Sequence, residues 1–437
     1  MFRLRTISSQ QASTLILGCL ALLLVISIIV FPDQAFQSSL KGLSVWWKLV
    51  FPALLPFLIM TEIARGTGVL HGLGALLEPL LRLLFRLPGV GGWAVALGLT
   101  AGNPAGAIAV GGLRRDKLIT RDEAERLLTL SHLLSPVFLI TVVGVGFLQN
   151  AKTGLALTLL HYGSAIVLAL LQRFTHVRTV AEPEVVANRR AEARSLPSSA
   201  GLFGKCIAAW RNAHAADGRT FGKLLGDSVS RSIQQLMTVG GFMMIFSVLI
   251  QAVSLSPVIP YVSRLSAVLG LGSAADAEQL LSSVLPGLFE AHLGAYAMGQ
   301  SQLLTGSWPY ALLSALFAWG GLSTHAQVKS FILGTDIRYA VFLRSRLLHA
   351  AAAFVSTGLL WQPLNGWLAR SEAPAYLPAQ ALPAPAAGGW SLGGVNLWSL
   401  TGPTLLSFGF IMLLMLCLSV LAAAVVMKRH LSPPAQR

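Results

Sequence analysis

The chain has 437 residues, of which 54% are hydrophobic and 11% are charged, and it carries a formal net charge of +15. Soluble domains average about 25% charged residues, so the composition excludes an ordinary soluble protein. Three cysteines cannot build a disulfide framework or a four-thiolate metal site. The positive charge could indicate nucleic-acid binding, but cytoplasmic loops of membrane proteins also collect Lys and Arg. The sequence therefore predicts an all-α polytopic membrane protein that binds no nucleic acid.

Apolar runs of about 17 to 25 residues, long enough to cross a bilayer as helices, recur along the chain. Arg3 and Arg5 place the N-terminus in the cytoplasm, and an even number of crossings returns the C-terminus to the same side. The segment 172–231, with ten Lys and Arg against five acids, also falls inside. The eight predicted transmembrane helices cover 12–31, 43–64, 133–150, 154–171, 232–254, 308–333, 345–363 and 403–427.

The apolar stretch 91–112 is interrupted halfway and predicts a re-entrant helical hairpin. Basic residues lie on both sides of it, so both of its ends belong to the cytoplasmic face. Unwound backbone is tolerated in a membrane only where it is buried in protein or lines a wet cavity. The tip is therefore a candidate binding site in which Asn103 offers an amide to a solute, and a packed kink is the alternative. The backbone positions of the tip are Gly102, Pro104 and Gly106.

The stretch 280–300 mirrors this hairpin, because it is broken around Pro286 and Gly287 and both of its ends lie outside. Glu290 and His292 lie within the apolar run, where an ionisable group without a partner costs about 2.5 to 3.5 kcal/mol or more. A functional role is therefore expected for Glu290. His292 is its partner, a neutral core residue or a direct contact of the solute.

The predicted span 308–333 contains a third polar cluster, directly after Gly320 and Gly321. In a continuous helix residues two apart point about 200° apart, so alternate polar positions cannot share one face. Either the helix unwinds at the two glycines, or only some of the polar side chains face the site. The candidate side chains are Ser323, His325 and Gln327. The weaker counterpart in the first half is the segment 131–136.

The order of these features suggests an inverted repeat. In each half a span is followed by an amphipathic interfacial helix, a hairpin and two spans; in the first half a capping box at Thr120 and Glu123 starts a further amphipathic helix. Broken helices in inverted repeats are typical of secondary transporters, and a bundle of kinked spans is the alternative. The predicted parts are an N-terminal span with its external connection (1–42), the first repeat (43–171, hairpin 91–112), a cytoplasmic basic loop (172–231), the second repeat (232–365, hairpin 280–300), and an external Pro/Ala loop with the last span (366–437).

Signatures of other chemistry are sparse. The chain contains no H-E-x-x-H and no G-x-x-x-x-G-K-[ST] motif. A hydrolase built on Ser323 and His325 lacks an orienting carboxylate nearby in the sequence. The sequence therefore predicts neither an enzyme nor a metal site, and no cofactor apart from a coupling proton or sodium ion.

Several separated motifs, spread over roughly residues 15–365, resemble the sporulation integral membrane proteins of the YlbJ (SpoVV) type. That family carries nucleoside-recognition (Gate) domains and is similar in architecture to concentrative nucleoside transporters, whose two opposed hairpins cradle the solute. The motifs are FPALLPF at 51–57, LPGVG at 87–91, LITRDEAER at 118–126, GLFE at 287–290, GGLSTHAQV at 320–328 and TDIRY at 335–339.

The resemblance implies a transporter that moves dipicolinic acid toward the forespore of an endospore-forming bacterium, in the outer forespore membrane or the cell membrane. Dipicolinate is a flat dicarboxylate, so its site should offer helix N-termini and uncharged donors. Side chains that can donate are Asn103, Ser323, His325 and Gln327. Glu290 would have to be protonated, paired with His292 or bound to a coupling cation, because an ionised carboxylate repels a dianion.

Two other functions stay open. A transporter of nucleosides or related heterocycles would use the same fold, with Glu290 accepting hydrogen bonds from ribose hydroxyls. A membrane scaffold for spore-envelope assembly would use the basic segment 172–231 as a docking surface. The alternative for this segment is a solvated, partly disordered linker. The expected partners are a small-molecule solute and membrane lipid. Self-association into a homo-oligomer, and the choice between proton coupling, sodium coupling and passive flow, are not decided by the sequence.

Overall fold

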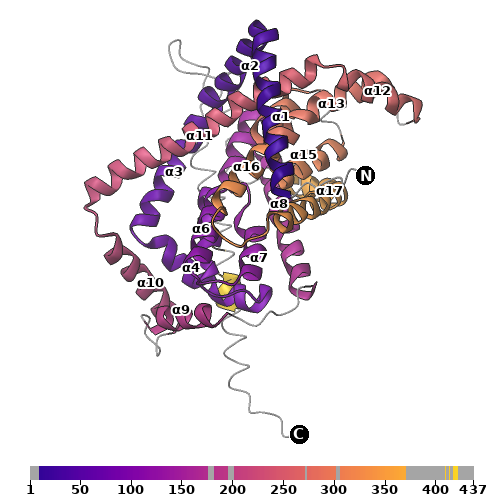
Figure 1. The fold of residues 1–437 in the computed structure, drawn as a ribbon. Helices are drawn as coiled ribbons and strands as arrows, with labels where there is room; N and C mark the ends of the chain where they lie inside the picture. The colour runs from indigo at the N-terminus through magenta and orange to yellow at the C-terminus, as the bar shows by residue number, and fades with distance from the viewer. Residues whose placement is uncertain are drawn as a thin grey trace, which may run out of the picture.

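The computed structural model describes residues 9–175, 182–194, 201–270, 273–301 and 306–370, together with positions 409, 413 and 417–421. All regular secondary structure in these ranges is helical, which confirms the predicted all-α class (Figure 1). The predicted span 403–427 and the loop before it lie largely outside the described residues. Four described helices are long and apolar enough to cross a membrane: Pro32–Gly66, Ala151–Phe174, Phe221–Leu255 and Tyr339–Leu368.

The four long helices pack in two pairs. The first helix of the four comprises α2 (Pro32–Val45), the π-helical turn η1 (Trp46–Val50) and α3 (Phe51–Gly66). It packs along α11 (Phe221–Leu255), while α8 (Ala151–Thr175) packs along α17 (Tyr339–Arg370). Trp46 Nε1 donates to Leu236 O across the first pair, at 2.9 Å. A Cβ atom on Gly240 would lie 2.6 Å from the Trp46 ring, so glycine permits this close packing.

Short helices occupy the segments between the long ones. In the first half these are α4 (Val69–Leu80), η2 (Leu81–Phe85), α5 (Gly91–Ala101), α6 (Ala105–Arg115), α7 (Arg121–Ser131) and η3 (Phe138–Phe147). In the second half they are α12 (Val258–Val268), α13 (Ala274–Phe289), α14 (Ala291–Gln300), α15 (Trp308–Trp319) and α16 (Gly321–Phe331). Because η2 directly continues α4, the two count as one element, and each half then has five short helical elements between two long helices. The order of helices in 32–175 is therefore the same as in 221–370. The placement of each half in a bilayer stays a prediction.

Two predicted spans are wrong as continuous helices. The span 308–333 divides into α15 and α16 at Gly320, whose φ of 85° is in the left-handed region that favours glycine. The span 133–150 contains only η3, because the helix before it ends at Ser131 and residues 132–135 are not helical. Pro136 disfavours helical geometry in the residue before it, which explains the interruption there.

The second hairpin is broken at a different residue from the one predicted. Pro286 and Gly287 lie inside α13, and the chain turns at Glu290, whose φ of −151° and ψ of 126° are extended. Gly287 instead serves close packing of the two arms, since a Cβ atom on Gly294 would lie 2.2 Å from Gly287 Cα.

The helix after the first hairpin has the predicted capping box and is buried inside the protein. Thr120 N donates to Glu123 Oε2 at 2.8 Å, and Glu123 N donates to Thr120 Oγ1 at 3.3 Å. Every residue from Ala124 to Ser131 is buried, because α7 packs against α5, α6, α8 and α17. Its amphipathic pattern reflects charged side chains that are paired inside the protein.

The segment 172–231 is largely helical where the structure describes it. It contains the end of α8, then α9 (Pro183–Arg194) and α10 (Leu202–Asp217), and α11 already begins at Phe221. α10 packs along α4. These parts are therefore structured, although no residue of α10 is buried, and the role of the segment as a linker stays a prediction. The remaining described helix is α1 (Ser9–Val30), at the N-terminus.

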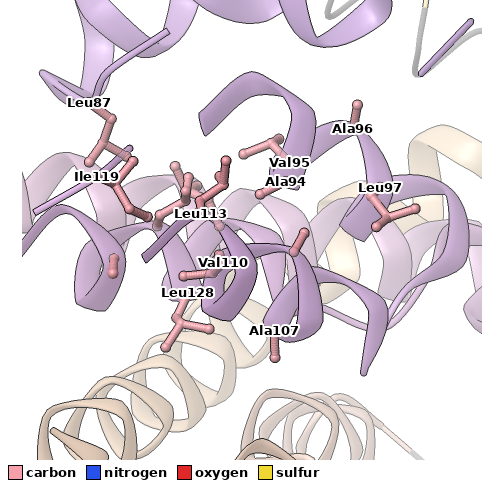
Figure 2. Packing of buried hydrophobic residues seen from close by; sticks show 14 of the residues in the cluster. Leu87, Ala94, Val95, Ala96, Leu97, Ala107, Val110, Leu113, Ile119 and Leu128 are labelled. Atoms are coloured by element: carbon pink, nitrogen blue, oxygen red, sulfur yellow. The ribbon is translucent and has the colours of Figure 1, made fainter. Parts of the chain in front are cut away.

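Small and aliphatic side chains of α5, α6 and α7 form a core around the first hairpin (Figure 2). Gly98 and Gly106 bring both arms against the backbone of α7: a Cβ atom at either position would lie 1.9 or 1.8 Å from Ser131 O. The hairpin is therefore packed on α7 and fixed in place by it. The labelled core residues are Leu87, Ala94, Val95, Ala96, Leu97, Ala107, Val110, Leu113, Ile119 and Leu128.

Candidate functional site

Four helix interruptions meet in pairs, one pair in each half. In the first half a Cβ atom on Gly102, at the hairpin tip, would lie 2.9 Å from Ser135 N, in the break between α7 and η3. In the second half a Cβ atom on Gly321, at the break between α15 and α16, would lie 2.9 Å from Glu290 Cα. Each hairpin tip thus touches the backbone of the next interrupted element.

The two halves also touch each other at these interruptions. Asn103 Nδ2 lies 3.5 Å from Thr324 Oγ1, in the first turn of α16. The His292 ring meets the Phe138 ring edge-on, with centroids 4.5 Å apart. The hairpin tip of each half therefore contacts the interrupted helix of the other half.

A cavity of about 40 Å³ lies where these elements meet. A cavity of this size holds only a few water molecules, so a solute larger than that requires the surrounding breaks to separate. Polar groups in its lining come from both halves: Thr100, Asn103, Ser135, Gln235 and His292.

Glu290 is buried and both of its carboxylate oxygens are engaged. Oε2 accepts from Leu293 N at 2.8 Å, which caps the N-terminus of α14. Oε1 lies 2.6 Å from His292 Nδ1. The structure thus joins the two predicted site residues as a pair, with the carboxylate at the positive end of a helix dipole.

Four helices start at the interruptions, and two of them have no side-chain cap at the N-terminus. Ser135 Oγ accepts from Phe138 N at 3.2 Å at the start of η3, and Glu290 caps α14. α6 and α16 have no side-chain cap. Uncapped N-termini offer backbone N–H groups and partial positive charge to an anion.

The predicted polar residues of α16 do not all face the same way. Ser323 is buried, and its Oγ has no hydrogen-bond partner among the described residues. His325 lies against other aromatic rings, with Nδ1 2.9 Å from Tyr339 Oη and Nε2 3.2 Å from Trp319 O. Of the predicted side chains, Asn103 and His292 line the cavity, whereas Glu290, Ser323, His325 and Gln327 do not. The helix does unwind at Gly320, one of the two predicted possibilities.

Sequence reasoning missed a buried basic cluster beside the interruptions. Arg346 donates to His132 O at 3.0 Å and to Thr129 O at 3.3 Å, so it caps the C-terminal end of α7. His349 Nε2 lies 3.1 Å from Ser164 Oγ and from His161 O. These ionisable residues lie within the predicted spans 154–171 and 345–363, so the rule that singled out Glu290 would have found them.

Comparison with known proteins identifies the family. Residues 47–154 match the Gate family, described as nucleoside recognition, and this range contains the first hairpin and both breaks of the first half. The chain is 36% identical to the sporulation integral membrane protein YlbJ of Bacillus subtilis (strain 168) over 360 residues, which are 81% of this chain and 84% of that protein. The chain therefore belongs to the YlbJ family of Gate-domain membrane proteins.

Proposed function

We propose that the protein is a secondary transporter that carries a small anionic heterocycle, best fitted by dipicolinic acid, across the outer forespore membrane during sporulation. The name of the Bacillus subtilis relative supports a role in sporulation. The observation that carries the proposal is the contact of four helix interruptions in pairs, three of which border one small polar cavity. Interrupted helices at the contact of two repeats are where secondary transporters bind their solutes.

An anionic solute fits the side of this site where α6 and α16 start without side-chain caps. Once the breaks separate, its carboxylates would take N–H groups at the uncapped starts of α6 and α16, together with the Asn103 amide and the Ser323 hydroxyl, which is buried outside the closed cavity. Its flat ring would lie against Phe138 in the cavity wall. On the other side Glu290 caps α14, and the negative charge of its carboxylate would orient the solute away from α14.

Glu290 and His292 are the candidates for coupling. Glu290 lies at the turn between the two hairpin arms and His292 lines the cavity, so a proton taken up by Glu290 would weaken both its bond to His292 and its charge-assisted cap on α14. A weaker cap and a weaker bond to His292 would loosen the hairpin tip. A sodium ion bound to the carboxylate would have the same effect, whereas passive flow would need neither.

A nucleoside transporter is the second candidate, and the match to the nucleoside-recognition family favours it. Glu290 would then accept hydrogen bonds from ribose hydroxyls instead of carrying a proton. This function places the solute at the opposite side of the cavity, on α14 and not on α6 and α16. The two candidates therefore differ in which side chains matter.

Uptake by proteoliposomes separates the candidates. We expect labelled dipicolinate to enter and unlabelled nucleosides not to compete with it.

Asn103→Ala and Ser323→Ala should each weaken apparent affinity about tenfold or more, since each removes a hydrogen bond to a charged group worth about 1.5 to 3 kcal/mol. Ser314→Ala is the matched control, because Ser314 is equally buried and has no hydrogen-bond partner among the described residues, but lies in the middle of α15 and not at a helix start. Uptake of nucleosides alone would support the second candidate, and uptake of neither would contradict both.

A further inference from the structure

A second and much larger cavity lies away from the helix interruptions. Its volume is about 670 Å³, within the range of about 300 to 1,000 Å³ that small-molecule sites occupy. It is enclosed by α4, η2, the turn before α5, α9 and α10. These elements lie together at the end of the molecule opposite α12 (Figure 1).

Three arginines and two glutamates line this cavity, and the charges do not balance. Glu78 pairs with Arg82 at 2.5 Å, and Glu123 pairs with Arg189. The remaining cation, Arg86, has no ion-pair or hydrogen-bond partner among the residues that the structure describes. The cavity therefore presents one uncompensated guanidinium group.

The backbone at Arg86 is in an unusual conformation. Its φ of 51° and ψ of 41° are left-handed, a region that residues other than glycine, asparagine and aspartate seldom adopt. Arg126, itself buried, donates to the carbonyl of the preceding residue, Phe85, and brings a second guanidinium group close. This left-handed residue ends η2, and the Arg86 side chain is exposed, so its guanidinium group is accessible to a ligand.

An aromatic pair forms another part of the wall. The rings of His71 and Trp93 are stacked, with centroids 4.2 Å apart and planes 11° apart. Trp93 lies in the first turn of α5, so the positive end of this helix also faces the cavity. Guanidinium groups next to a helix start are the usual donors for phosphate oxygens.

We propose that this cavity binds a phosphate-bearing anionic ligand through Arg86. The phosphate could belong to a soluble small molecule or to the head group of an anionic lipid, since both present the same oxygens. Binding here would act on the first hairpin, because α5 spans about 16 Å from this cavity to Thr100 and Ala101 at the central cavity. The binding itself does not depend on which solute the central cavity takes.

The test uses Arg86→Asn in the full-length protein. Asparagine removes the charge but tolerates the left-handed backbone, so the turn before α5 should still form. Arg264→Asn is the matched control, because Arg264 is an exposed arginine on α12, away from the cavity. Equal thermal unfolding temperatures of the two variants in detergent would show that both are folded.

Two binding measurements distinguish the sources of phosphate. Calorimetric titration of detergent-purified protein with pyrophosphate and with adenosine monophosphate tests soluble ligands. Native mass spectrometry after reconstitution in mixed phosphatidylglycerol and phosphatidylcholine nanodiscs tests lipid. We expect one of these ligands to bind the wild type and the Arg264 variant alike, and the Arg86 variant at least about tenfold more weakly. Absence of binding in both measurements, or equal binding by the Arg86 variant, would overturn the proposal.

Discussion

Gly106 determines how closely the first hairpin can approach α7. A Cβ atom there would lie 1.8 Å from Ser131 O, a backbone atom that cannot move aside as a flexible side chain can. We therefore expect Gly106→Ala to destabilise the protein by about 1 to 3 kcal/mol or more, the usual cost of overpacking. Gly112→Ala, in the same helix but with no atom within 4 Å, should leave stability unchanged or slightly raised. Thermal unfolding in detergent measures both, and equal midpoints would contradict this packing.

Glu290 combines two roles that a substitution can separate. Glu290→Gln keeps the size of the side chain and an oxygen that can accept from Leu293 N, but it removes the charge and the titration. If Glu290 carries the coupling proton, the variant should lose accumulation of dipicolinate against a gradient and keep exchange of labelled for unlabelled solute. His292→Gln is the companion variant, because it leaves the carboxylate and removes only its partner. Accumulation at the wild-type level in Glu290→Gln would exclude the residue from coupling.

The sequence could indicate part of this site. Glu290 stands out because ionisable residues are costly in apolar helices, and Asn103 stands out because glycine and proline surround it. Thr324 and Gln235 carry no such signal, since their approach to the cavity depends on how the two halves pack. His325 was selected by sequence proximity, yet the turn of α16 directs its ring to Trp319 and Tyr339. When a helix starts at an unusual turn, the direction in which its side chains point cannot be obtained from their spacing in the sequence alone.

A network of ion pairs joins the first hairpin to the connection between α16 and α17. Arg114, at the end of α6, pairs with Asp336 at 2.7 Å and with Glu182 at 3.0 Å. The Arg114 guanidinium holds the pKa of Asp336 below its usual value, so this pair is formed at neutral pH and is lost in acid. Arg338 pairs with Glu125 of α7 at 2.7 Å. The network ties together the ends of elements that a transporter has to separate.

We expect the pair of Arg338 and Glu125 to be its strongest link. The Glu125 side chain is fully buried and also accepts from Arg338 N at 3.0 Å, so Arg338→Gln leaves a buried carboxylate short of its cation. Because Arg338 itself is half exposed, the destabilisation should be about 1 to 3 kcal/mol, below the range for fully buried pairs. Lys117→Gln breaks an exposed pair with Glu184 and should cost at most about 1 kcal/mol. Thermal unfolding of both variants gives the comparison, and equal losses would contradict the ranking.

The helices themselves were predicted with mixed success. α4 and α12 confirm the two predicted amphipathic helices, because their apolar residues recur with helical spacing, and their interfacial position stays a prediction. The interruption after Ser131 is hidden within a long apolar run, where hydropathy counts residues and cannot detect a break. The interruption at Gly320 is one of the two possibilities that the paired glycines indicate. The second hairpin is predicted to break at Pro286 but breaks at Glu290. Proline is the usual helix breaker, and here it is tolerated within α13.

The whole molecule has two distinct ends. α4, α9 and α10 lie at one end, with the large cavity between them, and α12 lies at the other (Figure 1). The segment 172–231, which includes α9 and α10, carries ten Lys and Arg against five acids. Because Lys and Arg collect on the cytoplasmic side of membrane proteins, this end should face the cytoplasm. The end with α12 and the start of α13 should then face the opposite side.

Labelling of single cysteines tests this orientation. Cys19, Cys206 and Cys417 are replaced by serine, and a cysteine is then placed either at Ala187 on α9 or at Ala275 at the start of α13. Both alanines are exposed, so accessibility depends only on the side of the membrane. In intact cells that express the protein in the plasma membrane, an impermeant maleimide should label the cysteine at 275 and not the one at 187. After permeabilisation it should label both. Labelling of 187 in intact cells would reverse the orientation, and the large cavity with Arg86 would then face the outside.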